Sequence, residues 1–166
     1  MKNQNREKAT HLIRMAKIVS APVDLQNIAS ILEFEIIPYT FPRSTRGLVI
    51  IEDGIKVIGI NNKDPIYRQR FTIAHELGHV VNGHQYVEDE YEKGMSRIYT
   101  KHFQQEREAD MFAGEILMPK DFLISDLNTH GLNEELLRDK YVVSSTALWL
   151  RLTTLGLAEK YSAVKW

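Results

Sequence analysis

The sequence predicts an α+β fold, in which a small sheet containing antiparallel strands is followed by helices. Two apolar runs, 48–52 and 55–60, flank the dipeptide Asp53-Gly54, which accepts the positive φ angles of a tight hairpin turn. Beyond this hairpin, apolar residues recur at helical spacing over 68–82 and again over 106–119. A hairpin that precedes long helical patterns favours a sheet layer covered by helices.

Three further elements are expected before the hairpin. Apolar residues at helical spacing over Arg6–Val19 indicate an amphipathic helix. Pro22 is suited to open a second, short helix over Val23–Leu32. The apolar, β-branched run Glu35–Tyr39, closed by Phe41-Pro42, indicates a strand.

The hairpin leads into the first long helix through Asp64-Pro65, and Gly83 is expected to stop that helix. The residues that follow, 82–105, are polar and irregular, so they are expected to form a mobile insertion near a cleft.

A C-terminal helical lobe is expected over 123–166, packed on a core of residues 1–122 as a single compact unit. Two helical patterns in this lobe meet near Val142–Ser145, and Ser145 is suited to cap the second.

Composition limits the classes of function. The chain has 166 residues, 43% hydrophobic and 26% charged, which suffices for one good core. Its formal net charge of -1 attracts neither nucleic acid nor an anionic membrane. Apolar runs fall far short of the ~20 residues of a membrane span, and the polar N-terminal residues lack a signal-peptide core, so a cytoplasmic protein is expected. Without cysteine, the strong metal ligands available are histidine and carboxylate.

The stretch RFTIAHELGHVVNGH, residues 70–84, places polar side chains on an otherwise apolar helix. His75 and His79 are four residues apart, so both imidazoles can point at one metal ion. Glu76 lies about 100° around the helix axis, where it can take a proton from an attacking water and pass it to a leaving amine. This is the chemistry of HExxH peptidases. Gly78 costs the helix about 1 kcal/mol relative to alanine, which suggests that another element approaches closely.

A catalytic zinc site needs a third protein ligand, and the helical pattern EREADMFAGEILMP, residues 106–119, offers one. Glu106 and Asp110 share a face, so Glu106 can bind the metal while Asp110 accepts a hydrogen bond from the far nitrogen of a ligand histidine. Glu108 points away on an ideal helix and is the second choice for the third ligand. Glu115 lies further along the helix. The alternative interpretation of this pattern is a solvated, charged helix edge.

Together, RFTIAHELGH and EREADMFAGEILMP resemble the ImmA/IrrE family of zinc metallopeptidases, whose members pair HExxH with a glutamate-bearing helix that ends in a Leu-Met-Pro-like sequence. The resemblance implies a thermolysin-like, gluzincin-type minimal peptidase core. By motif position it also implies one zinc ion held by His75, His79 and Glu106, with Glu76 as general base. Asp110 would be the partner that orients His75, and it stands where many members have asparagine.

The short, single-domain form is most similar to the ImmA branch of phages and integrative mobile elements, since the IrrE branch carries an extra C-terminal sensor domain. This similarity implies a site-specific endopeptidase that cleaves the element's own helix-turn-helix immunity repressor and so relieves repression. A stress-response or toxin-antitoxin peptidase of the same family is one alternative. A regulator that binds the repressor or DNA without cleavage is another.

A peptidase of this type is expected to bind its substrate as an extended strand beside the HExxH helix. The second strand of the hairpin is the candidate, with Gly59 allowing close approach or a bulge. An ordinary internal strand is the alternative. The candidate substrate-binding residues are Val57, Ile58, Gly59 and Ile60.

A donor that stabilises the oxyanion is also expected, and the sequence does not single it out. The candidates are Tyr99, His102, His84, His130 and Tyr141. Arg70, just before the motif, is interpreted as equally suited to a structural ion pair.

The C-terminal lobe resembles a helix-turn-helix in outline, which raises DNA binding as a rival function. Its second helix, 145–157, has Arg151 as its one basic residue, whereas a recognition helix presents several groups to phosphates and to the edges of nucleobases. A role of the lobe in packing or in holding the substrate protein is therefore preferred. No direct binding to nucleic acid and no binding to a membrane is expected.

Overall fold

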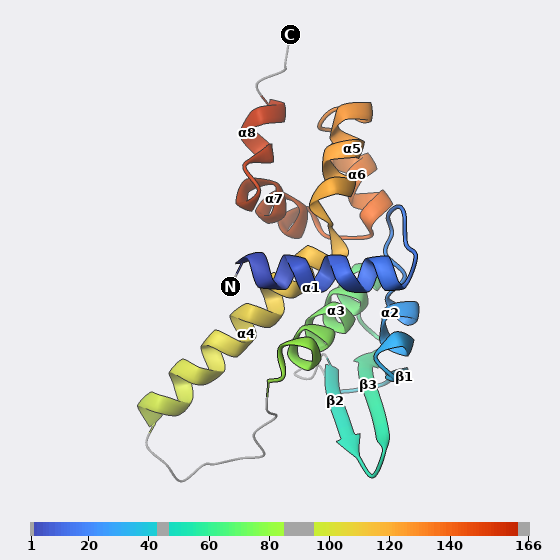
Figure 1. Ribbon diagram of the computed structural model, residues 1–166, viewed down its shortest axis with the longest axis vertical. Helices are drawn as coiled ribbons and strands as arrows, with labels where there is room; N and C mark the ends of the chain where they lie inside the picture. Colours follow the sequence, from blue (N-terminus) through green and yellow to red (C-terminus); the bar gives the residue numbers. More distant parts are fainter. Residues whose placement is uncertain (1, 43–46, 85–94, 163–166) are drawn as a thin grey trace.

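The computed structural model describes the backbone of residues 2–42, 47–84 and 95–162, and side chains for 3–42, 47–84 and 103–161. In Figure 1 the sheet lies toward one end, α5–α8 at the other, and α1 and α3 between them. The chain is a helix-rich α+β protein with a small sheet, as the sequence predicts. The elements are α1 (Lys2–Met15), α2 (Leu25–Ile31), β1 (Glu35–Tyr39), β2 (Gly47–Glu52), β3 (Ile55–Asn61), α3 (Ile66–Asn82), α4 (Met95–Leu117), α5 (Lys120–His130), α6 (Glu134–Tyr141), α7 (Ser145–Thr154) and α8 (Leu157–Ser162).

The predicted hairpin is confirmed. Asp53 has a φ of 48° and Gly54 a φ of 83°, the positive angles of a two-residue turn that matches the twist of its strands. β2 and β3 pair antiparallel on either side of this turn. Both strands lie within one residue of their predicted bounds, and β1 has the bounds that were predicted.

β3 is the central strand of the sheet. The order is β1-β3-β2, with β1 parallel to β3, so the sheet is mixed. Each of Val57, Ile58, Gly59 and Ile60 faces a residue of β1 on one side and a residue of β2 on the other. Two neighbouring strands therefore occupy this backbone, and the expectation that these four residues pair with a substrate is wrong. They form the internal strand of the alternative interpretation.

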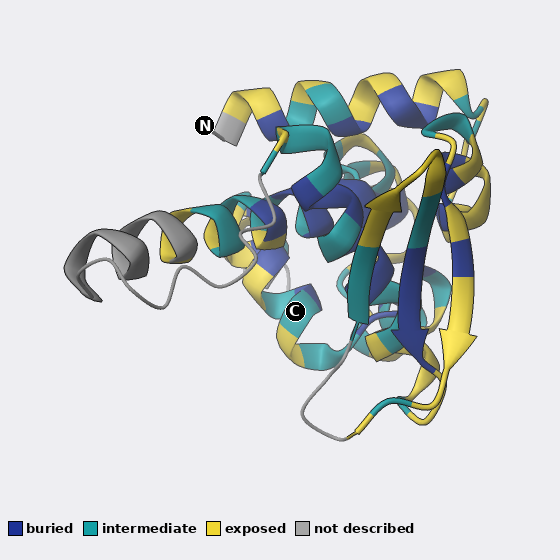
Figure 2. Cartoon of the chain, turned by 90° about the horizontal axis from the view of Figure 1, so that it is seen from below, coloured by how far each residue is buried: buried dark blue, intermediate teal, exposed yellow. Residues whose placement is uncertain are grey.

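One face of the sheet packs on α3 and buries Ile36, Ile58 and Ile60. Figure 2 shows this buried band along β3, flanked by the more exposed strands β1 and β2. In the part of the chain that the structure describes, β2 is paired on one side only, so its other side is an open edge.

α3 carries the HExxH motif and lies against the inner face of the sheet. It begins after Pro65 and ends where Gly83 adopts the left-handed conformation with a φ of 65°, which confirms the predicted stop. Lys8 of α1 donates to the carbonyl oxygen of Val81 at 3.2 Å and to Oδ1 of Asn82 at 2.7 Å. The C-terminal end of α3 is thereby tied to α1.

α4 is longer than predicted. Residues 95–105 were expected to belong to an irregular insertion, and they are helical and continuous with the predicted glutamate helix. The expected insertion is therefore wrong over this part. Its sequence carries Met95, Ile98, Tyr99 and Phe103 at helical spacing, a pattern that the polar residues between them obscured. Residues 85–94 lie outside the described part of the chain.

The first two helices differ from prediction at their ends. α1 begins earlier and ends at Met15, because Lys17 takes a positive φ of 55° that breaks the helical path. α2 begins at Leu25 and not after Pro22. Its cap is Asp24, whose side chain accepts the N–H of Asn27 at 3.0 Å.

Helices α5–α8 follow α4 in the chain. The boundary expected after residue 122 falls within α5, which spans Lys120–His130. Glu115 of α4 and Arg151 of α7 form a buried pair, with N···O distances of 2.8 Å and 2.5 Å. Nε of Arg151 also donates to the carbonyl oxygen of Met118 at 3.0 Å. These bonds fasten α7 to the end of α4.

The turn between α6 and α7 has a different cap from the one predicted. The hydroxyl of Ser144, and not that of Ser145, accepts the N–H of Ala147 at 3.2 Å. Ser145 is the first residue of the helix. Neighbouring serines compete for this position, and the extended backbone of Ser144 decides the outcome.

A cluster of buried apolar side chains joins α1, the inner face of the sheet, α3, α4 and the C-terminal helices. Phe112 of α4 and Tyr141 of α6 are among its largest fully buried members. Among the helices of the described ranges, none has both the length and the apolar character that a bilayer span requires.

Candidate metal centre

The candidate metal centre lies where α3 and α4 pack closely. A Cβ atom added to Gly78 would lie 2.9 Å from both the Cα and the carbonyl oxygen of Ala109. Only glycine permits this approach, so the close contact expected at Gly78 is confirmed. It brings the carboxylate-bearing face of α4 alongside the histidines of α3.

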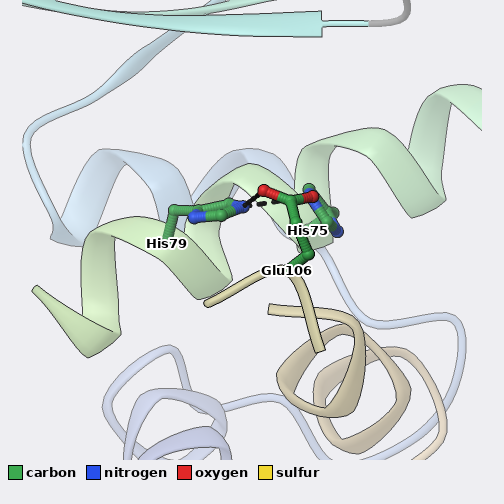
Figure 3. Close-up of side chains that lie close together, drawn as sticks. All are labelled: His75, His79 and Glu106. Carbon is green, nitrogen blue, oxygen red and sulfur yellow. Dashed lines mark hydrogen bonds and ion pairs between the residues drawn. The ribbon is translucent and has the colours of Figure 1, made fainter. Parts of the chain in front are cut away.

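His75 and His79 of α3 converge with Glu106 of α4. Each offers one ligand atom, and these atoms all lie within 4.8 Å of one another. The two Nε2 atoms are 3.0 Å apart, while the Glu106 carboxylate oxygens lie 3.2 Å from Nε2 of His75 and 3.3 Å from Nε2 of His79. Figure 3 shows the carboxylate beside the two imidazoles, with dashed lines to them. The structure thus brings together the three residues predicted as ligands.

These separations fit a small divalent cation. In a tetrahedral zinc site with bonds of about 2.0–2.1 Å, neighbouring ligand atoms are about 3.4 Å apart, close to the distances found here. Imidazole nitrogen and carboxylate oxygen are both ligands that zinc binds, and a catalytic zinc keeps a fourth position open. The side chain of Glu106 is 45% exposed, so the centre is accessible from solvent.

Asp110 contacts His75 at the ring nitrogen that faces away from Glu106. Its Oδ1 lies 2.9 Å from Nδ1 of His75, the contact that the family resemblance implies. A proton shared between these atoms leaves Nε2 of His75 with a lone pair for a metal. Burial lowers the pKa of His75, but the hydrogen bond to Asp110 and the charges of Glu76, Asp110 and Glu106 outweigh burial, so the net pKa is raised.

A second set of contacts, which the sequence did not predict, holds His79. Nδ1 of His84 lies 3.0 Å from Nδ1 of His79, and Nε2 of His84 lies 3.1 Å from Oε2 of Glu108. His84 was a candidate oxyanion donor and Glu108 the second choice for a ligand. Instead, His84 contacts the side of His79 that is remote from Glu106, and Glu108 contacts His84. The one sequence signal was Gly83, whose turn brings His84 back to His79.

Glu76 lies beside the centre and next to the start of β2. Burial raises its pKa above that of an ordinary glutamate; His75 lowers the pKa and Glu106 raises it further. A Cβ atom added to Gly47, the first residue of β2, would lie 3.4 Å from Oε1 of Glu76. The open edge of β2 therefore begins beside this carboxylate.

The other candidate oxyanion donors are not assembled at the centre by the described side chains. Tyr141 is buried in the C-terminal helices, and its hydroxyl donates to Oδ2 of Asp126 at 2.8 Å. His130 is exposed at the end of α5. Tyr99 and His102 lie in the segment of α4 whose side chains are outside the described set.

Two charged residues near the motifs have structural partners. Arg70 donates from Nη2 to the carbonyl oxygen of Val23 at 2.8 Å, which links α3 to the start of α2. Burial lowers the pKa of Arg70, and the charge of Asp24 opposes that shift. Glu115 pairs with Arg151 in the interior and does not reach the metal centre.

A comparison with protein families identifies the family to which the chain is related. The model of the IrrE N-terminal-like domain, peptidase M78, matches residues 35–153. The chain belongs to this family. The match runs from β1 through most of α7 and includes His75, His79 and Glu106. Membership indicates a metallopeptidase, and members are typically zinc-dependent, which agrees with the ligand set.

Among solved structures, the chain is similar to a Mycobacterium tuberculosis transcriptional regulator, with a TM-score of 0.68 and 13% sequence identity. The alignment covers 91% of this chain and 46% of the regulator, so the chain spans about half the length of that protein. At this identity the likeness concerns the fold alone. No curated protein matches the chain.

Proposed function

We propose that the protein is a zinc-dependent, site-specific endopeptidase that cleaves a helix-turn-helix repressor of a phage or mobile element and thereby relieves repression. The observation that carries the proposal is the convergence of His75, His79 and Glu106 beside the half-buried carboxylate of Glu76. Two histidines and a carboxylate, with a separate carboxylate at their side, are the parts that hydrolysis of a peptide needs.

In the proposed mechanism His75, His79 and Glu106 hold one zinc ion. When bound, zinc polarises the scissile carbonyl and lowers the pKa of water near it. Glu76 accepts the proton of the attacking water on its carboxylate and returns that proton to the leaving amine. Its raised pKa suits this role, since a carboxylate that binds protons more tightly is a stronger base at neutral pH.

The substrate is proposed to bind as an extended strand along the open edge of β2. In a two-residue hairpin the pair that closes the turn, here Glu52 and Ile55, exchanges both backbone hydrogen bonds, and bonded pairs then alternate with unbonded ones. Val49, opposite Ile58, falls at an unbonded position. Its N–H and C=O therefore point away from β3, toward the open edge. This edge, the HExxH helix and the glutamate helix would together form a thermolysin-like core.

The repressor as substrate rests on the resemblance to the ImmA branch. Cleavage of a stress or toxin-antitoxin regulator by the same centre is the alternative within the family. Binding of a repressor without cleavage would not need Glu76, so the two activities separate at that residue.

DNA binding through the C-terminal helices is disfavoured. α7, all of whose residues are described, carries Arg151 as its one basic residue. That side chain is 6% exposed and is paired with Glu115. It therefore cannot reach a phosphate, and α7 presents no cation to a DNA groove.

The test is co-expression with the helix-turn-helix repressor encoded beside the gene, followed by detection of repressor fragments. Wild-type protein is expected to produce one specific fragment, and Glu76→Gln to reduce its rate of formation by about 10²–10⁴-fold while zinc remains bound. Glu135→Gln, an exposed glutamate on α6, is the matched control and should cleave normally. An undiminished fragment with Glu76→Gln would contradict the mechanism. An intact repressor with zinc-loaded wild type would exclude it as substrate.

A further inference from the structure

We propose that His84 and Glu108 are positioning residues for the metal centre: His84 orients the ligand His79 and Glu108 orients His84. The proposal rests on the proposed metal site. It adds a chain of three side chains, called here the His79–His84–Glu108 relay, that governs how tightly one ligand histidine holds the ion.

The first part of the relay is built by the way α3 ends. Gly83 has a left-handed backbone, and its N–H donates to the carbonyl oxygen of Val80 at 3.1 Å. The N–H of His84 donates to the carbonyl oxygen of His79 at 3.0 Å. These two bonds close the helix and turn the chain back on itself. The ring of His84 therefore meets the ring of His79, with the two Nδ1 atoms 3.0 Å apart.

The second part comes from α4. Glu108 places Oε2 at 3.1 Å from Nε2 of His84, and Nε2 of Gln104 donates to its Oε1 at 3.0 Å. The side chain of His84 is 7% exposed and that of Glu108 is 21% exposed. The hydrogen bonds of the relay are thus largely shielded from water, where such bonds are stronger.

A proton count gives the relay one consistent arrangement for metal binding. If Nε2 of His79 binds a cation, its ring proton is on Nδ1 and is donated to Nδ1 of His84. The proton of His84 is then on Nε2, which donates to the carboxylate of Glu108. Every donor in the relay then has an acceptor, and the relay ends at the negative carboxylate of Glu108. The ligand nitrogen of His79 becomes a better electron donor as a result.

The two ligand histidines are held differently. At its Nδ1 atom His75 meets a carboxylate directly, that of Asp110, whose side chain is 58% exposed. His79 has a histidine between itself and the carboxylate, in a more buried setting. Glu108 is two residues from Glu106 on α4, so one helix supplies both a ligand and the end of the relay.

The test measures zinc affinity and does not depend on catalysis. Metal-free full-length chain is titrated with zinc against a chromophoric chelator for wild type, His84→Ala, Glu108→Ala and Glu108→Gln. His84→Ala and Glu108→Ala are expected to weaken zinc binding by about 10–100-fold. Glu108→Gln should recover much of the loss, because its amide oxygen still accepts from His84. His130→Ala, an exposed histidine at the end of α5, should bind zinc like wild type.

A spectroscopic readout separates positioning from general damage. In zinc-loaded wild type, nitrogen NMR of the histidine rings should show the proton of His79 on Nδ1 and that of His84 on Nε2. In Glu108→Ala, the His84 ring is expected to lose that preference while circular dichroism stays unchanged. If His84→Ala does not fold, Glu108→Ala and Glu108→Gln decide the matter.

Zinc affinities of folded Glu108→Ala and His84→Ala within twofold of wild type would overturn the relay. Failure of the wild-type chain to bind zinc would overturn the proposed metal site itself. Normal zinc binding, weakened in these variants, without cleavage of any repressor would support the relay and contradict only the proposed substrate.

Discussion

Gly78 of α3 and Ala109 of α4 are in contact through their backbones, and a Cβ atom at residue 78 would lie 2.9 Å from the Cα of Ala109. His79 follows Gly78 directly, and Glu106 precedes Ala109 by one turn of helix. The distance between these two helices therefore sets the distance between the metal ligands they carry.

Gly78→Ala is expected to lower both the free energy of unfolding and the zinc affinity. Alanine favours an isolated helix by about 1 kcal/mol, but the clash with backbone at Ala109 costs about 1–3 kcal/mol and moves α4 outward. Urea unfolding of the metal-free chain and zinc titration measure the two effects. Gly114→Ala is the control, since a Cβ there would meet only Cδ of Arg151, at 4.0 Å. Equal stability and zinc affinity of Gly78→Ala and wild type would refute this role for glycine.

Removal of Asp110 is expected to weaken zinc binding through His75. Asp110→Ala takes away the acceptor at 2.9 Å from Nδ1 of His75 and should reduce zinc affinity by about 10–100-fold. Asp110→Asn keeps a carbonyl oxygen and should lose less. Titration with zinc ranks the three chains, and an Asp110→Ala chain that binds zinc as wild type does would show that His75 needs no partner.

The pair of Glu115 and Arg151 is expected to stabilise the attachment of the C-terminal helices without affecting the metal centre. Both side chains are more than nine-tenths buried, and Arg151→Ala leaves the Glu115 carboxylate with the longer contact to Nε of Arg6 at 3.6 Å, so the variant should lose about 3 kcal/mol of unfolding free energy. Replacing both residues by methionine should recover part of the loss. Denaturant unfolding gives these values. A loss below about 1 kcal/mol in Arg151→Ala would argue against a buried, mutually dependent pair.

The open edge of β2 is expected to bind substrate through its backbone. Val49→Pro removes an N–H that points away from β3, so it should impair cleavage strongly while the β2–β3 ladder is kept. Val49→Ala retains the N–H and removes similar packing, so it isolates the contribution of the backbone group. The initial rate of repressor cleavage is the measurement, with circular dichroism to check the fold. Equal rates for the two variants would remove β2 from the substrate site.

The parts of the fold and the site that depend on local geometry could be predicted from the sequence. The hairpin follows from Asp53-Gly54, because few dipeptides accept two positive φ angles. That His75 and His79 face one metal site follows from the repeat of a helix once the helix is recognised. Glu106 and Asp110 could be paired with them only through a second motif.

The parts that depend on distant segments could not be predicted. β1 pairs in parallel with β3, and no local pattern indicates that a strand more than 15 residues earlier occupies the far side of the hairpin. That pairing makes β3 internal and moves the open edge to β2. His84 and Glu108 meet only because a left-handed turn and the packing of α4 act together. On an ideal helix Glu108 points in a different direction from Glu106, and in the structure its carboxylate contacts His84 and not the metal centre.

The measurement that tests the central claim most directly is a zinc titration of the metal-free chain and of Glu106→Ala. The claim is that residues from two separate helices form one zinc site. Wild type should bind one zinc ion per chain, and Glu106→Ala should bind it more than about 100-fold more weakly, since loss of a ligand exceeds the effect of losing an orienting partner. Equal zinc stoichiometry and affinity in the two chains, or no zinc bound by wild type, would contradict the claim.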